Sequence, residues 1–369
     1  MQEVSLCGQQ LGEKTNVTSS EGVGAAFQVR RRQVTVRFSM DEIIAITPDV
    51  SGQENVAWFT HVLKNWIGFG YLGENASYMG YIFGLLLMFL MLSQAIYLSM
   101  FCMMYILSFL LYIYKKMNNI VQDTSTEAWV TPRRRLTSAL DIIGKIWHGY
   151  EVIGTEHIPE GPAVIVYYHG AFVLDYMLFV ARLYTLTGRH IYSVADNGLY
   201  LLPGVRPLLE LFFCLKGNKD ECVKFLKKGH LLGIAPGGLR EGNFSDENYN
   251  LVWGKRTGFA QVALQAKVPI IPMFTQNLRE GYRTYGKISL LKWLYEKTRI
   301  FILPIYGGFP VKFRTYIGEP IPYDPDITAK ELAEKTKIAL ENIRNRYQER
   351  PGNILRALLE RFDKYHKEN

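Results

Sequence analysis

The feature that most constrains the fold is a long stretch from Asn75 to Tyr114 that contains no charged residue and no histidine. A helix that crosses a bilayer takes about 20 mostly apolar residues, and this stretch is about twice that length. It is therefore either two short spans joined as a hairpin or one long tilted helix. We favour a transmembrane hairpin with its tip near Ser93 and both ends cytosolic, where Lys115 and Lys116 are expected. A buried helix pair of a soluble protein is the remaining alternative.

Two segments precede the apolar stretch. Residues 1–54 are polar and rich in Ser, Thr, Gly and Gln, a composition typical of a mostly disordered tail. Residues 55–74 carry tryptophan and phenylalanine at helical spacing, which predicts an amphipathic helix in the membrane interface. A soluble packing helix is an equal alternative for this segment. No signal peptide is expected, because the first residues have neither a basic start nor an apolar core.

Charge and cysteine content exclude several classes of protein. The net charge is +8, and the basic clusters Arg30–Arg32 and Arg133–Arg135 lack the interleaved aromatic residues of a nucleic-acid site. Beside an apolar stretch, such clusters favour the anionic face of a membrane. The four cysteines form no CxxC pair, so neither a disulfide framework nor a metal site is predicted, and a reducing compartment is expected.

Residues 118–369 are predicted to form an α/β domain with a central mixed sheet flanked by helices. Short runs of Ile, Val and aromatic residues alternate there with helical patterns, as in folds with a buried sheet. Pro269 and Pro272 predict that their strand lies at an edge or is irregular. The candidate strands are Ala163–Tyr168, Ile191–Ala195, Leu231–Ala235, Pro269–Phe274 and Phe313–Ile317. The candidate helices are 221–228, 258–266 and one from the capping box Thr328–Glu331 to about Arg346.

The first candidate site lies where an apolar strand ends in His169, with Asp175 six residues later. A neutral imidazole at a strand end can take a proton from an alcohol, and a carboxylate bonded to its other nitrogen would fix the tautomer. Gly170 next to the ring lets a substrate or another backbone approach. For this pair alone, a packed, hydrogen-bonded histidine is the simpler interpretation.

The second candidate site also follows an apolar strand. Pro236, Gly237 and Gly238 predict a turn with accessible backbone N–H groups, and Arg240 and Glu241 come directly after it. Backbone donors with one guanidinium can bind an anion or a polar head group. An ordinary turn with an exposed Arg–Glu pair is the alternative. Because ligand groups gather at the carboxyl ends of parallel strands, the two loops together favour one shared site.

Three blocks, "YYHGAFVLD", "APGGLREG" and "VPIIPMF", follow the apolar stretch in this order. Together they resemble the glycerolipid acyltransferase superfamily, which includes PlsC-like and diacylglycerol acyltransferase-related enzymes. The resemblance covers about residues 147–362. It implies a multi-pass membrane protein of the endoplasmic reticulum with a cytosolic catalytic domain, which acylates mono- or diacylglycerol to form di- or triacylglycerol.

The resemblance also implies roles for residues. His169 would be the catalytic base and Asp175 its partner. Acyl-CoA would be a co-substrate, no cofactor or metal would be needed, and the partners would be membrane lipids and a neutral glycerolipid. The oligomeric state is not indicated. The substrate-binding residues would be Gly170, Pro236, Gly237, Gly238, Arg240 and Glu241.

Two departures from the superfamily pattern bear on this site. The usual His-x4-Asp is His-x5-Asp here, so a bulge or a shifted helix start must absorb one residue for His169 to meet Asp175. The usual Glu-Gly-Thr-Arg is replaced by Pro-Gly-Gly-Leu-Arg-Glu. Glu241 beside Arg240 is expected to neutralise part of the guanidinium charge and to disfavour a phosphorylated acceptor.

Three rival functions share some of these features. A lysophospholipid or glycerol-phosphate acyltransferase would use the same chemistry on a phosphate-bearing acceptor. A lipid-ester hydrolase would use His169 to activate water. A non-catalytic lipid-binding protein would keep the membrane segment and the sheet but would tolerate the loss of His169 and Asp175.

Overall fold

The computed structural model describes residues 75–120, 127–298 and 305–362. From Tyr81 onward the chain forms one compact unit. The predicted tail 1–54 and the predicted interfacial helix 55–74 lie outside the described residues.

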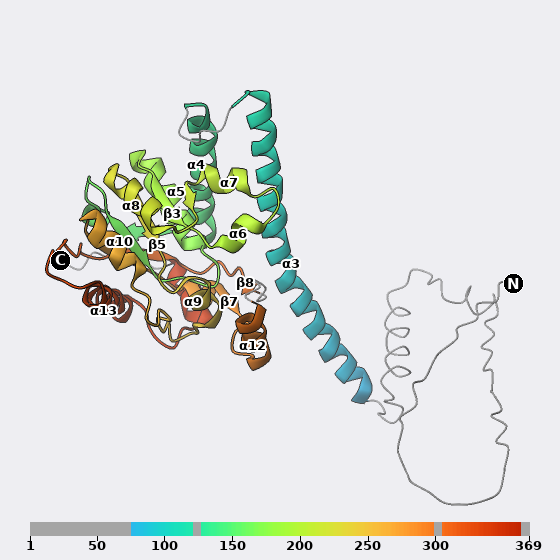
Figure 1. Ribbon diagram of the computed structural model, residues 1–369. Helices are drawn as coiled ribbons and strands as arrows, with labels where there is room; N and C mark the ends of the chain where they lie inside the picture. The colour runs from blue at the N-terminus through green and yellow to red at the C-terminus, as the bar shows by residue number, and fades with distance from the viewer. Residues whose placement is uncertain (1–74, 121–126, 299–304, 363–369) are drawn as a thin grey trace, which may run out of the picture. The chain divides into compact units, whose positions relative to one another are not determined.

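A mixed sheet of seven strands, in the order β1-β9-β6-β2-β5-β3-β4, forms the centre of this unit. Figure 1 shows two of its strands, β3 and β5, among the surrounding helices. β6, β2, β5, β3 and β4 run parallel to one another, and β9 and β1 run in the opposite direction. The carboxyl ends of five strands therefore meet at one edge. The strands are β1 (Glu151–Ile153), β2 (Val164–Tyr167), β3 (Ile191–Val194), β4 (Cys214–Leu215), β5 (Leu231–Ile234), β6 (Ile270–Gln276) and β9 (Arg314–Ile317).

The five strands predicted from the sequence are confirmed to within two residues at each end, but the expected position of β6 is wrong. β6 lies in the middle of the sheet, between β2 and β9, and all of its residues are buried. Pro272 is tolerated there because β9 ends at Ile317, opposite Met273, so its missing N–H costs one ladder bond at most. The carbonyl of Pro272 still accepts from the N–H of Gly318, at 2.8 Å.

Helices cover both faces of the sheet. The chain moves from β2 to β3 in one direction across the sheet and from β5 to β6 in the other, so right-handed crossovers put the intervening helices on opposite faces. α4 (Val130–His148) packs on α5 (Leu174–Thr187), whereas α8 (Lys219–Lys227), α10 (Gly258–Ala266) and α13 (Ala329–Tyr347) pack together (Figure 1). The predicted capping box of α13 is confirmed.

Shorter elements complete the unit. A two-stranded antiparallel pair joins β7 (Tyr282–Thr284) to β8 (Ile305–Gly307). The short α-helices are α6 (Asn197–Leu201), α7 (Arg206–Leu211), α9 (Gly238–Phe244), α11 (Leu278–Gly281), α12 (Ser289–Thr298) and α14 (Ile354–Leu359). The 3-10 turns are η1 (Glu127–Trp129), η2 (Thr155–His157) and η3 (Glu360–Phe362).

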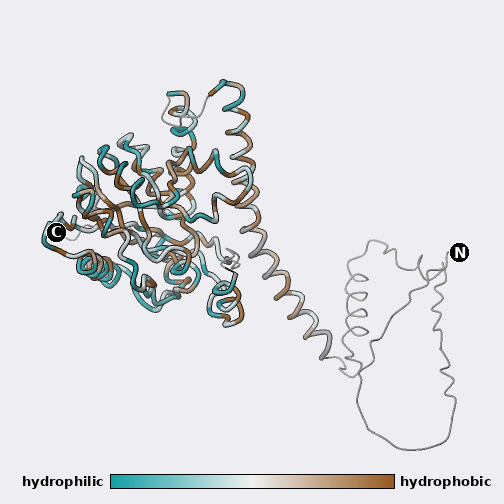
Figure 2. The backbone as a smooth tube through the Cα atoms, in the orientation of Figure 1, coloured by the Kyte–Doolittle hydropathy of each residue, from teal (hydrophilic) through white to brown (hydrophobic). Residues whose placement is uncertain are grey.

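The apolar stretch forms one uninterrupted helix, α3 (Asn75–Met117), so the predicted hairpin is wrong. Nothing near Ser93 breaks a helix, since neither proline nor glycine occurs there. Much of α3 is apolar along its length (Figure 2), and Leu111 near its end packs with Trp129 and α7. None of the helices in the described residues has both the length and the apolar character needed to cross a membrane.

Candidate active site

The loop after β2, which carries His169, and the loop after β5, which carries Pro236 to Gly238, lie side by side because β2 and β5 are neighbours. The carboxylate of Glu241 ties the first loop to the segment after α9. It accepts hydrogen bonds from the backbone N–H groups of His169 and Val252, both at 2.9 Å. Glu241 is fully buried. The structure thus confirms that the two predicted loops share one edge of the sheet.

Glycines allow this close approach. A Cβ atom on Gly242 would lie 2.7 Å from Nδ1 of His169 and 2.8 Å from the carbonyl oxygen of Gly170, and one on Gly237 would lie 2.4 Å from the Glu241 side chain. Gly238 has a φ of +51°, which favours glycine. Any side chain at position 237 or 242 would therefore push the imidazole or the carboxylate out of place.

The His169 ring is held in a defined state. Its Nδ1 lies 2.8 Å from the carbonyl oxygen of Gly170, which can only accept a hydrogen bond, so Nδ1 donates and Nε2 carries the lone pair. Burial lowers the pKa of His169 to about 4, and the carbonyl of Gly170 partly opposes this shift. The positive charge of Arg279 lowers the pKa further, whereas Asp196 raises it. At neutral pH the imidazole is uncharged and can accept a proton at Nε2.

Asp175 does not make the predicted contact with His169. It is buried, and its Oδ1 has no hydrogen-bond partner. Burial raises its pKa to about 7, and a hydrogen bond from Thr275 in the core strand β6 opposes that rise. The extra residue of the His-x5-Asp spacing is taken up by the turn at 171–173, after which Asp175 enters α5 on the side of the core. Its part in the reaction stays a prediction.

Arg240 and Glu241 point to different places, which corrects the expectation that they neutralise each other. Glu241 is turned into the site, whereas the half-exposed guanidinium of Arg240 lies 3.7 Å from Glu296 in α12. An ion pair this exposed contributes little to stability. Arg240 therefore lies outside the cluster around His169.

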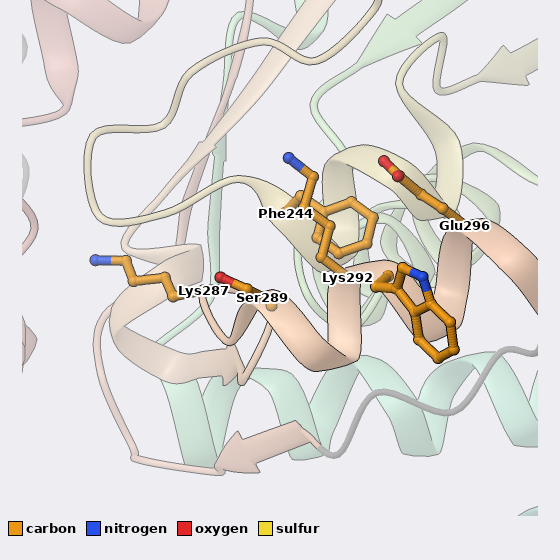
Figure 3. A pocket seen from close by; sticks show the side chains of 7 residues that line it. Phe244, Lys287, Ser289, Lys292 and Glu296 are labelled. Carbon is orange, nitrogen blue, oxygen red and sulfur yellow. The ribbon is translucent and has the colours of Figure 1, made fainter.

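Glu296 also lines an open cavity of about 400 Å³ between α9 and α12. Figure 3 shows the Phe244 ring and the side chains of α12 around it. The lining residues are Phe244, Gly286, Lys287, Ser289, Lys292, Trp293 and Glu296. The cavity adjoins the far end of the helix that starts at the Pro-Gly-Gly loop, and none of its lining residues belongs to the cluster around His169.

The predicted turn at Pro236–Gly238 forms, but its N–H groups are less free than expected. The N–H of Gly238 donates to the carbonyl of Ala235, at 3.1 Å. Arg256, which no sequence motif indicated, donates from Nη1 to the carbonyls of Pro236 and Gly237, each at 2.8 Å. Within the described part of the chain, the N–H of Gly170 donates to no backbone acceptor.

Arg279 is the second residue that the sequence analysis missed. It follows β6, is 1% exposed, and donates to carbonyl oxygens of the His169 loop and of α9. One signal could have identified Arg279: it lies in a polar segment that directly follows a buried strand. Asp196, after β3, was missed for the same reason.

Comparisons with known proteins identify the family of this chain. An acyltransferase family profile matches residues 149–276. A human protein named "DGAT1/2-independent enzyme synthesizing storage lipids" is 47% identical over 84% of this chain and 97% of its own length. A chicken protein of the same name is 49% identical over 85% and 95%. The crystal structure of the 1-acyl-sn-glycerophosphate acyltransferase PlsC from Thermotoga maritima is 14% identical, covers 66% of this chain and 96% of that chain, and has a TM-score of 0.40.

Proposed function

Since the chain belongs to the transmembrane protein 68 family of acyltransferases, we propose that it transfers a fatty acyl group from acyl-CoA to the hydroxyl of mono- or diacylglycerol. The relatives named as enzymes synthesizing storage lipids support a neutral glycerolipid product. The observation that carries the proposal is the place of His169: its ring, with the lone pair on Nε2, lies at the end of β2 between two glycine-containing loops.

The proposed reaction is direct transfer. Nε2 of His169 takes the proton of the acceptor hydroxyl while that oxygen attacks the thioester carbonyl. The C–S bond then breaks, and the imidazolium returns the proton to the departing thiolate of CoA. The N–H of Gly170 is the candidate donor to the developing oxyanion. The hydrogen bond from Nδ1 to the Gly170 carbonyl keeps the ring in the tautomer that this sequence requires.

Two observations support an uncharged acceptor. The guanidinium of Arg279 bonds only to backbone and hydroxyl oxygens of the protein, and Arg240 is paired with Glu296 away from His169. Neither arginine is thus presented to a phosphate beside the imidazole. A lysophospholipid or glycerol-phosphate acceptor would need such a cation.

We place the enzyme at the cytosolic face of the endoplasmic reticulum membrane, where acceptor and product dissolve. This placement is supported by the distribution of side chains on α4. A helix in water normally buries its apolar side chains and exposes its polar ones, whereas the second half of α4 does mostly the opposite. The residues that it buries are polar, or are glycine: Arg133, Thr137, Asp141, Gly144 and His148. Four of the five side chains that it exposes near its end are apolar, namely Ile142, Ile143, Ile146 and Trp147, and the fifth is Lys145, which pairs with the buried Asp141. Flotation with liposomes should weaken in an Ile143→Glu, Ile146→Glu variant; unchanged flotation contradicts a membrane contact of α4.

The function is tested with the full chain in membranes, labelled acyl-CoA and a panel of acceptors. Monoacylglycerol and diacylglycerol should be acylated, whereas lysophosphatidate and glycerol 3-phosphate should not. Preferred acylation of a phosphorylated acceptor would replace the proposal with the lysophospholipid alternative. Release of fatty acid at the same rate without any acceptor would identify a hydrolase instead.

A further inference from the structure

We infer that Arg279 is the positioning residue of this site, and that its buried guanidinium holds the loop of His169 against the helix that carries Glu241 and Gly242. The inference rests on the proposed role of His169 as the base. It assigns to Arg279 a role that the motifs around His169 and Pro236 do not include.

The guanidinium makes four hydrogen bonds in a fork. Nε donates to the hydroxyl of Tyr168 at 2.8 Å, and Nη1 donates to the carbonyl of Gly242 at 2.8 Å. Nη2 donates to the carbonyl of Glu241 at 2.7 Å and to that of His169 at 3.3 Å. The acceptors at Tyr168 and His169 belong to the loop after β2, and those at Glu241 and Gly242 belong to α9. One planar group therefore joins the two parts of the site.

Arg279 is itself held firmly. Its backbone N–H donates to the hydroxyl of Tyr249 at 2.8 Å, and that hydroxyl also donates to the buried carboxylate of Glu280. Asn277, two residues earlier, lies in the left-handed region with a φ of +66° and donates to the carbonyl of Lys312 at 3.0 Å. These contacts of Arg279 and Asn277 with buried residues fix the position of the guanidinium. A shift of the His169 loop would therefore break the hydrogen bonds between the guanidinium and that loop.

A lysine cannot replace this fork. An ammonium group donates from one point, whereas the four acceptors of Arg279 lie around a plane. A glutamine would also remove the charge. The charged groups that act on the imidazole are Arg279, which lowers the pKa of His169, and Asp196, which raises it. The Glu241 carboxylate accepts from the His169 backbone N–H; burial raises the pKa of that carboxyl to about 7, and this hydrogen bond and the charge of Arg279 partly oppose the rise.

The test compares Arg279→Lys and Arg279→Gln, with Arg344→Lys as the matched control. Arg344 is also buried, but it bonds to the carbonyl of Tyr249 and not to either loop. We expect Arg279→Lys to lower kcat roughly 10- to 100-fold, because misplacing the base by about an ångström has effects of that size. The KM for acyl-CoA should change less than about threefold, and Arg344→Lys should leave kcat within about threefold.

The pH dependence separates positioning from charge. In ¹³C-histidine NMR titrations, the pKa of His169 should stay near its wild-type value in Arg279→Lys and should rise in Arg279→Gln. A role confined to folding would lower the melting temperature without this difference between the two variants. Equal kcat in Arg279→Lys and wild type would overturn the inference, and a fall of kcat in Arg279→Gln alone, together with a rise of the His169 pKa, would assign the role of Arg279 to its charge instead of its fork.

Two further outcomes keep the inference separate from the proposed function. If His169→Gln retains activity, the proposed base is wrong, but the NMR titration still tests whether Arg279 acts on His169. If neither Arg279 variant folds, Tyr168→Phe decides the matter, because it keeps the guanidinium and removes the acceptor of its Nε. We then expect a several-fold lower kcat, and an unchanged kcat would count against the positioning role.

Discussion

Two buried histidines of this protein, His148 at the end of α4 and His169 after β2, are alike in most respects. In each, Nδ1 lies close to a backbone carbonyl, that of Val311 at 3.0 Å and that of Gly170 at 2.8 Å. Burial lowers the pKa of both to about 4. Neither the depressed pKa nor the fixed tautomer therefore identifies a catalytic base.

Their surroundings differ. The ring of His148 stacks on Phe313 with centroids 3.9 Å apart, and its Nε2 is sealed in the core without a partner. The ring of His169 lies against Gly242 and Gly170, and its Nε2 is not among the sealed polar atoms of the described residues. The comparison teaches that what packs against the ring sets the two histidines apart: an aromatic core side chain for His148, and glycines at the edge of the sheet for His169.

The largest expected effect separates the two histidines directly. His169→Gln should lower kcat on the order of 10³-fold, because the general base is lost. His148→Gln should leave kcat within a few-fold and should lower the free energy of unfolding instead, because it disturbs the packing on Phe313. Initial rates with labelled acyl-CoA and denaturant unfolding of both variants provide the measurement. The distinction breaks down if both variants lose activity equally while remaining folded.

The second prediction displaces the ring of His169 from its place against Gly242. In Gly242→Ala the new methyl group would start 2.7 Å from Nδ1, so the ring must move. We expect kcat to fall on the order of 10²-fold. Gly161→Ala is the matched control, since a Cβ there has no neighbour within 4 Å. An active Gly242→Ala enzyme would show that the ring position is not critical.

The third prediction concerns Asp175, the partner expected from the sequence. Loss of a true dyad carboxylate costs about 10⁴-fold in kcat, whereas a core carboxyl without contact to His169 should leave kcat within about tenfold. We expect the smaller effect for Asp175→Asn, measured as kcat with saturating acyl-CoA. A loss of several thousand-fold in a folded variant would restore the dyad.

The smallest expected effect is on stability. The folded-state pKa values of His148 and His169, about 4, lie below the ordinary 6.5, so the unfolded chain binds more protons below pH 6.5. The contribution of each neutral histidine to the free energy of unfolding is complete above pH 6.5. It is lost as the pH falls toward 4 and changes no further below that. The unfolding free energies of His148→Gln and His169→Gln should each depend less on pH in this window than that of the wild type. Different slopes for the two variants would show that the two histidines are not thermodynamically alike.

Local sequence determined the main helices and strands of this protein. Apolar runs with glycine or proline after them predicted β2 and β5, and the same runs put His169 and Pro236 at strand ends. The capping box at Thr328 located the start of α13. These features depend on residues a few positions apart, which is why a pattern in the sequence can identify them.

The site itself was decided by tertiary structure. The direction of Glu241, the turn of Asp175 into the core and the fork of Arg279 depend on β2, β5 and β6 becoming neighbours, although they are far apart in the chain. No local pattern encodes that pairing, since it follows from burial of the whole sheet. Sequence alone therefore determined that a histidine and a glycine turn would end two strands. Only the packed sheet determined which charged groups reach them, because side-chain direction and burial are properties of the assembled core.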